Sequence, residues 1–156
     1  MNIEFDLEEL FGFLTGKAST AIGRRLQRNL KQAGLEVTQE QFAVLFALWQ
    51  KDLQSQQELA TATFKDKPSI TRLIDGLERT GLAARMNHPS DRRSNLVYLT
   101  DKGKTLKSKA LKMAYQTIEE ALAGLSAVEI ETCKHVLNQV FSNLLQEETK
   151  VDREKN

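Results

Sequence analysis

A change of hydrophobic period after Gly81 constrains the fold of this chain more than any other feature. From Ser55 to Gly81, apolar residues recur every three or four positions, which is typical of helices that pack by one face. Beyond this point, residues 83–87 and 96–99 alternate like two short strands, and the polar, turn-rich segment 88–95 separates them. The sequence therefore predicts short helices followed at once by a β-hairpin with a charged tip.

Capping patterns predict where these short helices begin and end. Ser55-Gln56-Gln57-Glu58 is a capping box that opens a helix to about Thr63. Asp66 can cap the next helix, and Pro68 fits its first turn, where a missing amide costs nothing. Gly81 is placed to end this second helix in a left-handed cap. We therefore expect two helices joined by a tight turn.

Longer helices are predicted on both sides of this segment. Apolar spacing over residues 7–30 indicates one amphipathic helix that Gly34 closes. A capping box at 38–41 opens a strongly apolar helix through Trp49, and further caps open helices near residues 101 and 127. The sequence contains neither an internal repeat nor an interdomain linker, so we expect one domain over residues 1–156. Within it, we expect a lobe over 35–100 and flanking helices over 5–33 and 101–147.

The distribution of charge is more informative than the net charge of +1. Between Thr61 and Lys107, ten lysines and arginines outnumber five acids. This asymmetry fits a basic footprint for nucleic acid, although a solvated charged face would have the same composition. The longest apolar run, Phe42–Trp49, is far shorter than the ~20 residues of a membrane span. With a single cysteine, Cys133, and an acidic amino end, we expect a cytoplasmic protein that does not bind membranes.

The start of the helix after the tight turn carries side chains suited to DNA. An arginine can bond guanine through two donors, and short hydroxyls can bond either partner of a base pair. The candidates in this segment are Lys67, Pro68, Ser69, Thr71 and Arg72. The alternatives are a polar helix surface for the two hydroxyls, and a pairing of Arg72 with Asp75 or Glu78 along the helix.

The predicted hairpin tip carries a second basic group, Arg92 and Arg93. An arginine in a narrow minor groove gains from the concentrated negative potential there. Asp91 would repel phosphates, so we expect its carboxylate to hold an arginine guanidinium in place. Solvated charges on an exposed turn are the alternative interpretation.

The segment from Asp91 to Gly103, DRRSNLVYLTDKG, resembles the wing signature of the MarR family of bacterial regulators, an Asp-x-Arg element followed by a strand and Leu-Thr-x-x-Gly. Residues 68–78, PSITRLIDGLE, resemble the family's recognition helix, and Gly81-Leu82 follows as expected. The wing motif is fairly specific, whereas the helix alone would be weak. The resemblance extends over nearly the whole chain.

This resemblance implies a fold, a partner and a mode of action. The fold would be mainly α with a small β-hairpin wing: a winged helix-turn-helix lobe plus N- and C-terminal helices that form a homodimer. The dimer would bind double-stranded DNA at a pseudo-palindromic operator with half-sites ~34–36 Å apart. Arg93 would enter the minor groove with Asp91 as its orienting partner, and Arg92 would contact phosphate. Most members are repressors that a small lipophilic or phenolic ligand releases.

A ligand pocket is the least constrained expectation. Five apolar residues could line it, although a helix core or a dimer seam would show the same spacing: Phe11, Leu14, Phe42, Phe46 and Met113. We expect neither a cofactor nor a metal, since Cys133 and His135 point to different faces of a helix. Cys133 lies in an apolar stripe, where a cysteine serves as a small hydrophobic residue.

Two other classes of function are alternatives to DNA binding. The sequence lacks a nucleophile elbow, a P-loop and a zinc spacing, so we expect neither catalytic residues nor an enzyme. A winged helix could instead bind a protein partner, because a fold does not determine its function. A regulator that responds to oxidation or to a metal is a further alternative.

Overall fold

The computed structural model describes residue 6 and residues 10–154, with side chains described to Leu145. The chain forms two compact units, which divide after Ile118. The elements, in chain order, are α1 (Phe11–Gln32), α2 (Gln39–Gln50), β1 (Gln54–Ser55), α3 (Gln56–Thr63), α4 (Lys67–Arg79), β2 (Ala83–Asn87), β3 (Asn95–Leu99), α5 (Asp101–Ala121) and α6 (Ala127–Glu154). The prediction of a mainly α chain with a β-hairpin is confirmed. Leu7, which the first helix was expected to include, lies outside the described residues.

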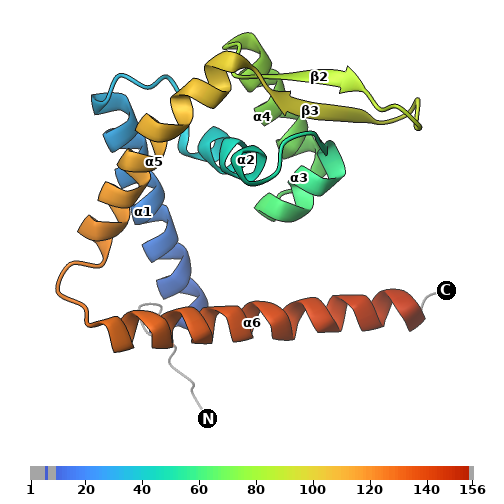
Figure 1. Ribbon diagram of the computed structural model, residues 1–156. Coiled ribbons are helices and arrows are strands. Elements are labelled where there is room, and N and C mark those ends of the chain that lie inside the picture. The colour runs from blue at the N-terminus through green and yellow to red at the C-terminus, as the bar shows by residue number, and fades with distance from the viewer. Residues whose placement is uncertain (1–5, 7–9, 155–156) are drawn as a thin grey trace. The chain divides into compact units, whose positions relative to one another are not determined.

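Helices α2, α3 and α4 enclose the core of the first unit, and the hairpin β2–β3 extends from them (Figure 1). The hairpin and the segment that precedes it cover the apolar faces of these three helices. The most deeply buried side chains are Val44, Leu45, Leu48, Leu59, Ile70, Ile74, Leu77, Leu82 and Val97. Helix α1 is linked to α5 by a buried hydrogen bond of 2.9 Å from Asn29 Nδ2 to Thr117 Oγ1. Apolar burial is the main stabilising contribution to such a lobe.

The predicted helix ends are observed. Gly81 has a φ of +71°, and the amide of Leu82 donates to the carbonyl of Leu77 at 2.9 Å, as in a Schellman cap. Phe64 ends α3 in the same left-handed region, at a φ of 51°, without the freedom of a glycine. The end of α3 is closed by local backbone bonds, from the Phe64 amide to the Thr61 carbonyl at 3.2 Å and from the Lys65 amide to the Ala60 carbonyl at 3.0 Å.

The sheet contains one strand that the sequence prediction missed. Its order is β1-β3-β2, with both pairs antiparallel. Strand β1 is only two residues long, and Gln54 pairs with Val97 while Ser55 pairs with Leu96. A strand this short has no periodicity to detect, because its pairing is made with residues some forty positions away. It ties the start of α3 to the central strand of the sheet.

The capping box of α3 includes an unusually acidic glutamate. The Glu58 carboxylate accepts from the Ser55 amide at 2.8 Å, and the Lys51 ammonium lies 2.8 Å from its other oxygen. The hydrogen bond from Lys51, followed by that from Ser55, lowers the pKa of Glu58 from 4.5 to about 2. A carboxylate with a lowered pKa stabilises the fold above its ordinary pKa, and this contribution is lost as the pH falls through the folded value.

We therefore expect Glu58→Gln to lower the Tm at pH 7, and this deficit to shrink as the pH approaches 2. Thermal unfolding followed by circular dichroism at several pH values measures the effect. Glu131→Gln is the matched control, because Glu131 forms an exposed pair with Lys134 on α6 and surface pairs contribute little. A deficit that is constant from pH 7 to pH 2 would contradict the role assigned to the Glu58 carboxylate.

Candidate nucleic-acid interface

The first turn of α4 presents the segment that was predicted to contact DNA. The Asp66 carboxylate caps the helix by accepting from the Ser69 amide at 2.7 Å. This bond, with a smaller contribution from the charge of Arg72, lowers the pKa of Asp66. Lys67 and Pro68 are exposed, and Ser69 is half-buried. The cap thus fixes a helix start whose cations point to solvent.

Arg72 is exposed, and its guanidinium lies 3.4 Å from the Ser69 hydroxyl. The proposed alternative was a pair with Asp75 or Glu78 on the same helix. Both of these carboxylates are instead bound by Arg85 of β2. The guanidinium of Arg72 is therefore available to a ligand from outside the lobe.

Thr71 has a different environment from its neighbours. Its hydroxyl donates to the Lys67 carbonyl at 3.0 Å and accepts from the Gln56 side-chain amide at 3.1 Å. The donor that could have served a base is therefore used inside the protein, where it joins α4 to α3. For the predicted groove contact, Thr71 therefore retains only its methyl group and the second lone pair of its hydroxyl oxygen.

The tip of the wing is a folded turn rather than a loose loop. The His88 amide donates to the Ser94 carbonyl, and the Ser94 amide donates to the Asp91 carbonyl, both at 3.1 Å. His88 Nδ1 also lies 3.2 Å from the Ser90 hydroxyl. Arg92 and Arg93 are exposed on this turn, which lies at the far end of the β2–β3 hairpin (Figure 1).

The expectation for Asp91 was wrong in its detail. Its carboxylate accepts from the backbone amide of Arg93 at 2.9 Å, and among the described residues no ion pair joins it to a guanidinium. An aspartate that bonds the amide two positions later forms an Asx turn, which is the commoner local use of this side chain. Asp91 therefore shapes the backbone of the tip and leaves the charges of both arginines exposed.

Arg85, in the middle of β2, is a residue of this region that the sequence prediction did not single out. Its side chain contacts Gln56 of α3 and Thr71, Asp75 and Glu78 of α4. The only sequence signal was an arginine at a half-buried strand position, which does not reveal partners on two other elements.

The five apolar residues predicted to line a pocket lie on three helices, α1, α2 and α5. Phe42 stacks on Phe46, with ring centroids 6.1 Å apart, and Met113 packs against the core. Phe11 and Leu14 are exposed on α1. Their spacing indicates an apolar helix face, and whether that face encloses a ligand depends on contacts that spacing does not encode.

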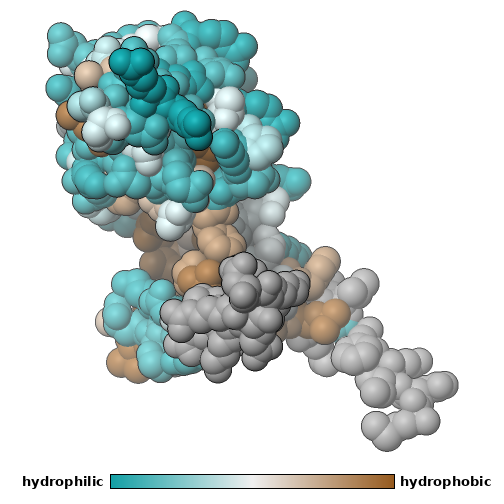
Figure 2. All heavy atoms as spheres, turned by 90° about the vertical axis from the view of Figure 1, so that its right-hand side faces the viewer, coloured by the Kyte–Doolittle hydropathy of each residue, from teal (hydrophilic) through white to brown (hydrophobic). Residues whose placement is uncertain are grey.

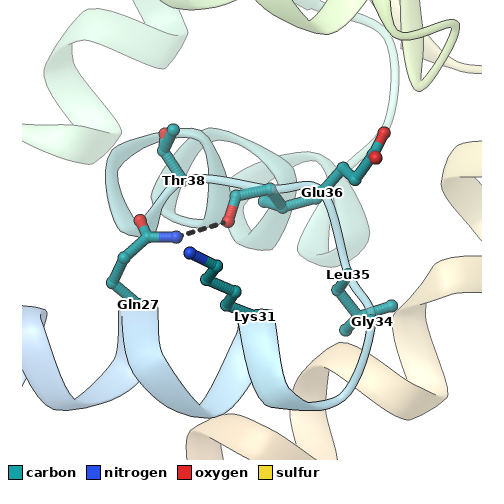
Figure 3. Close-up of a pocket in the computed structure, with 7 residues that line it drawn as sticks. Gln27, Lys31, Gly34, Leu35, Glu36 and Thr38 are labelled. Atoms are coloured by element: carbon teal, nitrogen blue, oxygen red, sulfur yellow. Dashed lines mark hydrogen bonds between the residues drawn. The ribbon is translucent and has the colours of Figure 1, made fainter.

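A different pocket lies between the end of α1 and the loop before α2 (Figure 3). It is an open hollow of about 460 Å³, and Gln27 and Lys31 reach into it from α1. The Gln27 side chain donates to the Val37 carbonyl at 3.3 Å and accepts from the Gln39 amide at 2.9 Å. These bonds fix the loop to α1, so Gln27 has a structural role.

Metal ligands, the cysteine and the apolar helices are the other candidate features of the described part of the chain. No group of three His, Cys, Asp or Glu side chains there could hold a metal ion. Cys133 is exposed, so the burial expected of a small hydrophobic residue is not observed within the single chain. None of the helices described combines the length and the hydropathy that crossing a membrane requires.

The first unit thus has two connected helices, α3 and α4, followed by a wing with exposed arginines. This arrangement defines a winged helix-turn-helix protein. The model of the MarR family matches residues 37–95. The chain as a whole has the fold of MarR-family transcriptional regulators.

Solved structures share this fold along most of the chain. BpsR of Bordetella bronchiseptica is 26% identical with a TM-score of 0.80, covering 87% of this chain and 96% of BpsR. MarR of E. coli is 27% identical with a TM-score of 0.68, covering 84% and 96%. The transcriptional repressor CouR, solved on a 23-mer DNA duplex, is 27% identical with a TM-score of 0.73, covering 91% and 98%.

Proposed function

We propose that this chain is a sequence-specific DNA-binding regulator that acts as a homodimer and is not an enzyme. The observation that carries the proposal is the pair of exposed basic groups on one lobe, Lys67 and Arg72 on α4 and Arg92 and Arg93 on the wing. Among the described residues, none of these four cations forms an ion pair. Because charges without internal partners retain their full attraction for phosphate, they favour a polyanion as the ligand.

The surface of the lobe supports the same proposal. Seen from the wing side, it is mostly hydrophilic (Figure 2). Helix α4 would enter the major groove with Lys67, Pro68, Ser69 and Arg72 near base edges, and the wing tip would reach the adjacent minor groove. Of the hydroxyls, Ser69 is the better candidate for a base contact, because the Thr71 hydroxyl is already bonded to Gln56.

A homodimer is proposed from apolar side chains outside the lobe. On α1 of the first unit, Phe11, Phe13 and Leu14 are each more than two-fifths exposed. On α6 of the second unit, Val136, Leu137 and Leu144 are also exposed. Exposed apolar patches of this kind mark interaction surfaces. In a dimer with two-fold symmetry, each copy would cover these patches on the other copy. We propose residues 35–100 as the DNA-binding lobe and 5–33 and 101–147 as the dimerisation region.

We also propose that the protein is a repressor released by a small lipophilic or phenolic ligand. CouR is described as a repressor, and the DNA binding of BpsR is described as regulated by 6-hydroxynicotinic acid. Phe42, Phe46 and Trp49 form an aromatic cluster, and a planar ligand could stack on its ring surfaces.

The test is a titration of the purified protein with the DNA upstream of its own coding region, next to a scrambled duplex. Both are measured at about 50 mM and about 200 mM salt. We expect binding to the native fragment to be tighter by roughly 10³ or more, and both affinities to decrease steeply with salt. If this fragment is not preferred, selection from a random duplex library decides the question. A library with no enriched sequence would contradict the proposal and favour a winged helix that binds a protein.

A further inference from the structure

The Arg85 side chain contacts four residues of the helix-turn-helix. Its Nε donates to Gln56 Oε1 at 3.0 Å, and its Nη2 lies 2.9 Å from Asp75 Oδ1. Its Nη1 binds Glu78, whose other carboxylate oxygen accepts from the backbone amide of Arg85 at 2.9 Å. The side chain is only 18% exposed. One planar fork therefore joins β2 to both helices of the helix-turn-helix.

This network has the geometry of a brace. Strand β2 continues into the wing tip, and α4 carries the segment that would enter the major groove. The backbone carbonyl of Thr71 also lies 3.5 Å from the guanidinium, so the brace reaches the turn next to Arg72. A guanidinium bound to several acceptors at once has little freedom to rotate, because its donors lie in one plane.

The same contacts determine which charges of α4 stay free. Asp75 lies three residues after Arg72, at the spacing of neighbours on one helix face, and would otherwise be available to it. Since Arg85 binds the carboxylates of both Asp75 and Glu78 and offsets one of their two negative charges, Arg72 is left for an external anion.

We propose that Arg85 is a positioning residue for DNA binding, which holds the wing and α4 in one fixed relation so that both engage the operator together. This inference rests on the proposed function, because it concerns how the same surface binds DNA. Arg85 itself does not contact the DNA. Its effect reaches the DNA through the orientation of Arg72, Arg92 and Arg93.

Neutralising the acids of the network distinguishes positioning from simple charge. Removing a negative charge from a DNA-binding lobe strengthens binding on electrostatic grounds alone. The brace predicts the opposite for Asp75→Asn and Glu78→Gln, a loss of operator affinity of roughly tenfold. Glu36→Gln is the control, an exposed acid outside the network, for which we expect equal or slightly tighter binding.

Arg85→Lys provides the second comparison, because it keeps the charge and loses the fork. We expect it to lower operator affinity roughly tenfold. Binding to the scrambled duplex and the salt slope of that binding are expected to stay unchanged. If Arg85 contacted phosphate directly, lysine would largely preserve affinity, and both acid variants would bind more tightly than the wild type. That pattern would overturn the inference.

A measurement without DNA separates this inference from the proposed function. Hydrogen exchange of the free protein is expected to accelerate at the amides of β2 and β3 in Arg85→Lys and Glu78→Gln, while those of α6 keep the wild-type rate. Unchanged exchange in the wing would show that Arg85 does not hold it. A wild-type protein that binds no DNA would contradict the proposed function, whatever the exchange rates show.

Discussion

Gly103→Ala is expected to lower the free energy of unfolding by about 3 kcal/mol, the upper end of typical overpacking costs. Gly103 lies buried in the first turn of α5. A Cβ atom at this position would lie 2.0 Å from the backbone carbonyl oxygen of Leu82 and 3.2 Å from a methyl group of Leu99. Alanine would otherwise favour the helix by about 1 kcal/mol, so the clash must outweigh that gain.

Neither side of this contact can move cheaply. The Leu82 carbonyl accepts from the Thr100 amide, and the Thr100 hydroxyl donates to the Gly81 carbonyl at 2.6 Å. On the opposite side, the Gly103 carbonyl accepts from the Trp49 indole at 3.0 Å within the core. A shift of α5 that made room for a methyl group would lengthen or break these bonds.

Urea unfolding at a fixed protein concentration measures this change, since the stability of an oligomer depends on concentration. Gly16→Ala in α1 is the matched control, because its added Cβ would meet no atom within 4 Å. We expect the control to stabilise the protein by up to about 1 kcal/mol. If both variants were stabilised, the close contact at Leu82 would not constrain the fold.

The double substitution Arg92→Ala and Arg93→Ala is expected to weaken operator binding by roughly a hundredfold or more, with the unfolding midpoint unchanged. Both side chains are exposed on a turn whose shape depends on the Asp91 carboxylate and on backbone bonds. Their removal therefore leaves the turn intact. What is lost is positive charge at the one part of the lobe that extends away from the helices.

Fluorescence anisotropy of a labelled operator at several salt concentrations measures this loss. The salt slope is expected to decrease by about one for each phosphate contact that is removed. Lys109→Ala combined with Lys112→Ala removes the same charge from an exposed face of α5 and serves as the control. If the wing variant and the control lost affinity equally, only net charge would matter, and the wing would have no specific role.

Local signals account for the part of the fold that the sequence predicted well. The caps at Thr38, Ser55 and Asp66 each bond an amide three residues later, so the pattern and the bond lie within one turn of helix. The left-handed glycines Gly34 and Gly81 are equally local. Strand β2 was predicted with its observed bounds because alternation is visible over five residues.

The features that were missed depend on distant partners. Strand β1 exists only because Leu96 and Val97 pair with it. The contacts of Arg85 extend over 29 residues to Gln56. Asp91 shows a different error, since an ion pair with an arginine side chain was expected where a bond to the backbone amide of Arg93 was available. Residue types identified the region of the candidate site, but its internal bonds could only come from the folded chain.

The joint between β3 and α5 is a single residue, Thr100, and β1 runs directly into α3. These connections are too short for the elements to move independently. This limits how the DNA-binding helix of such a protein can be replaced to change its target sequence. If helix α4 alone were transplanted, it would lack strand β2 and Arg85, which hold it in place. The natural module for exchange is the whole segment from Gln54 to Thr100.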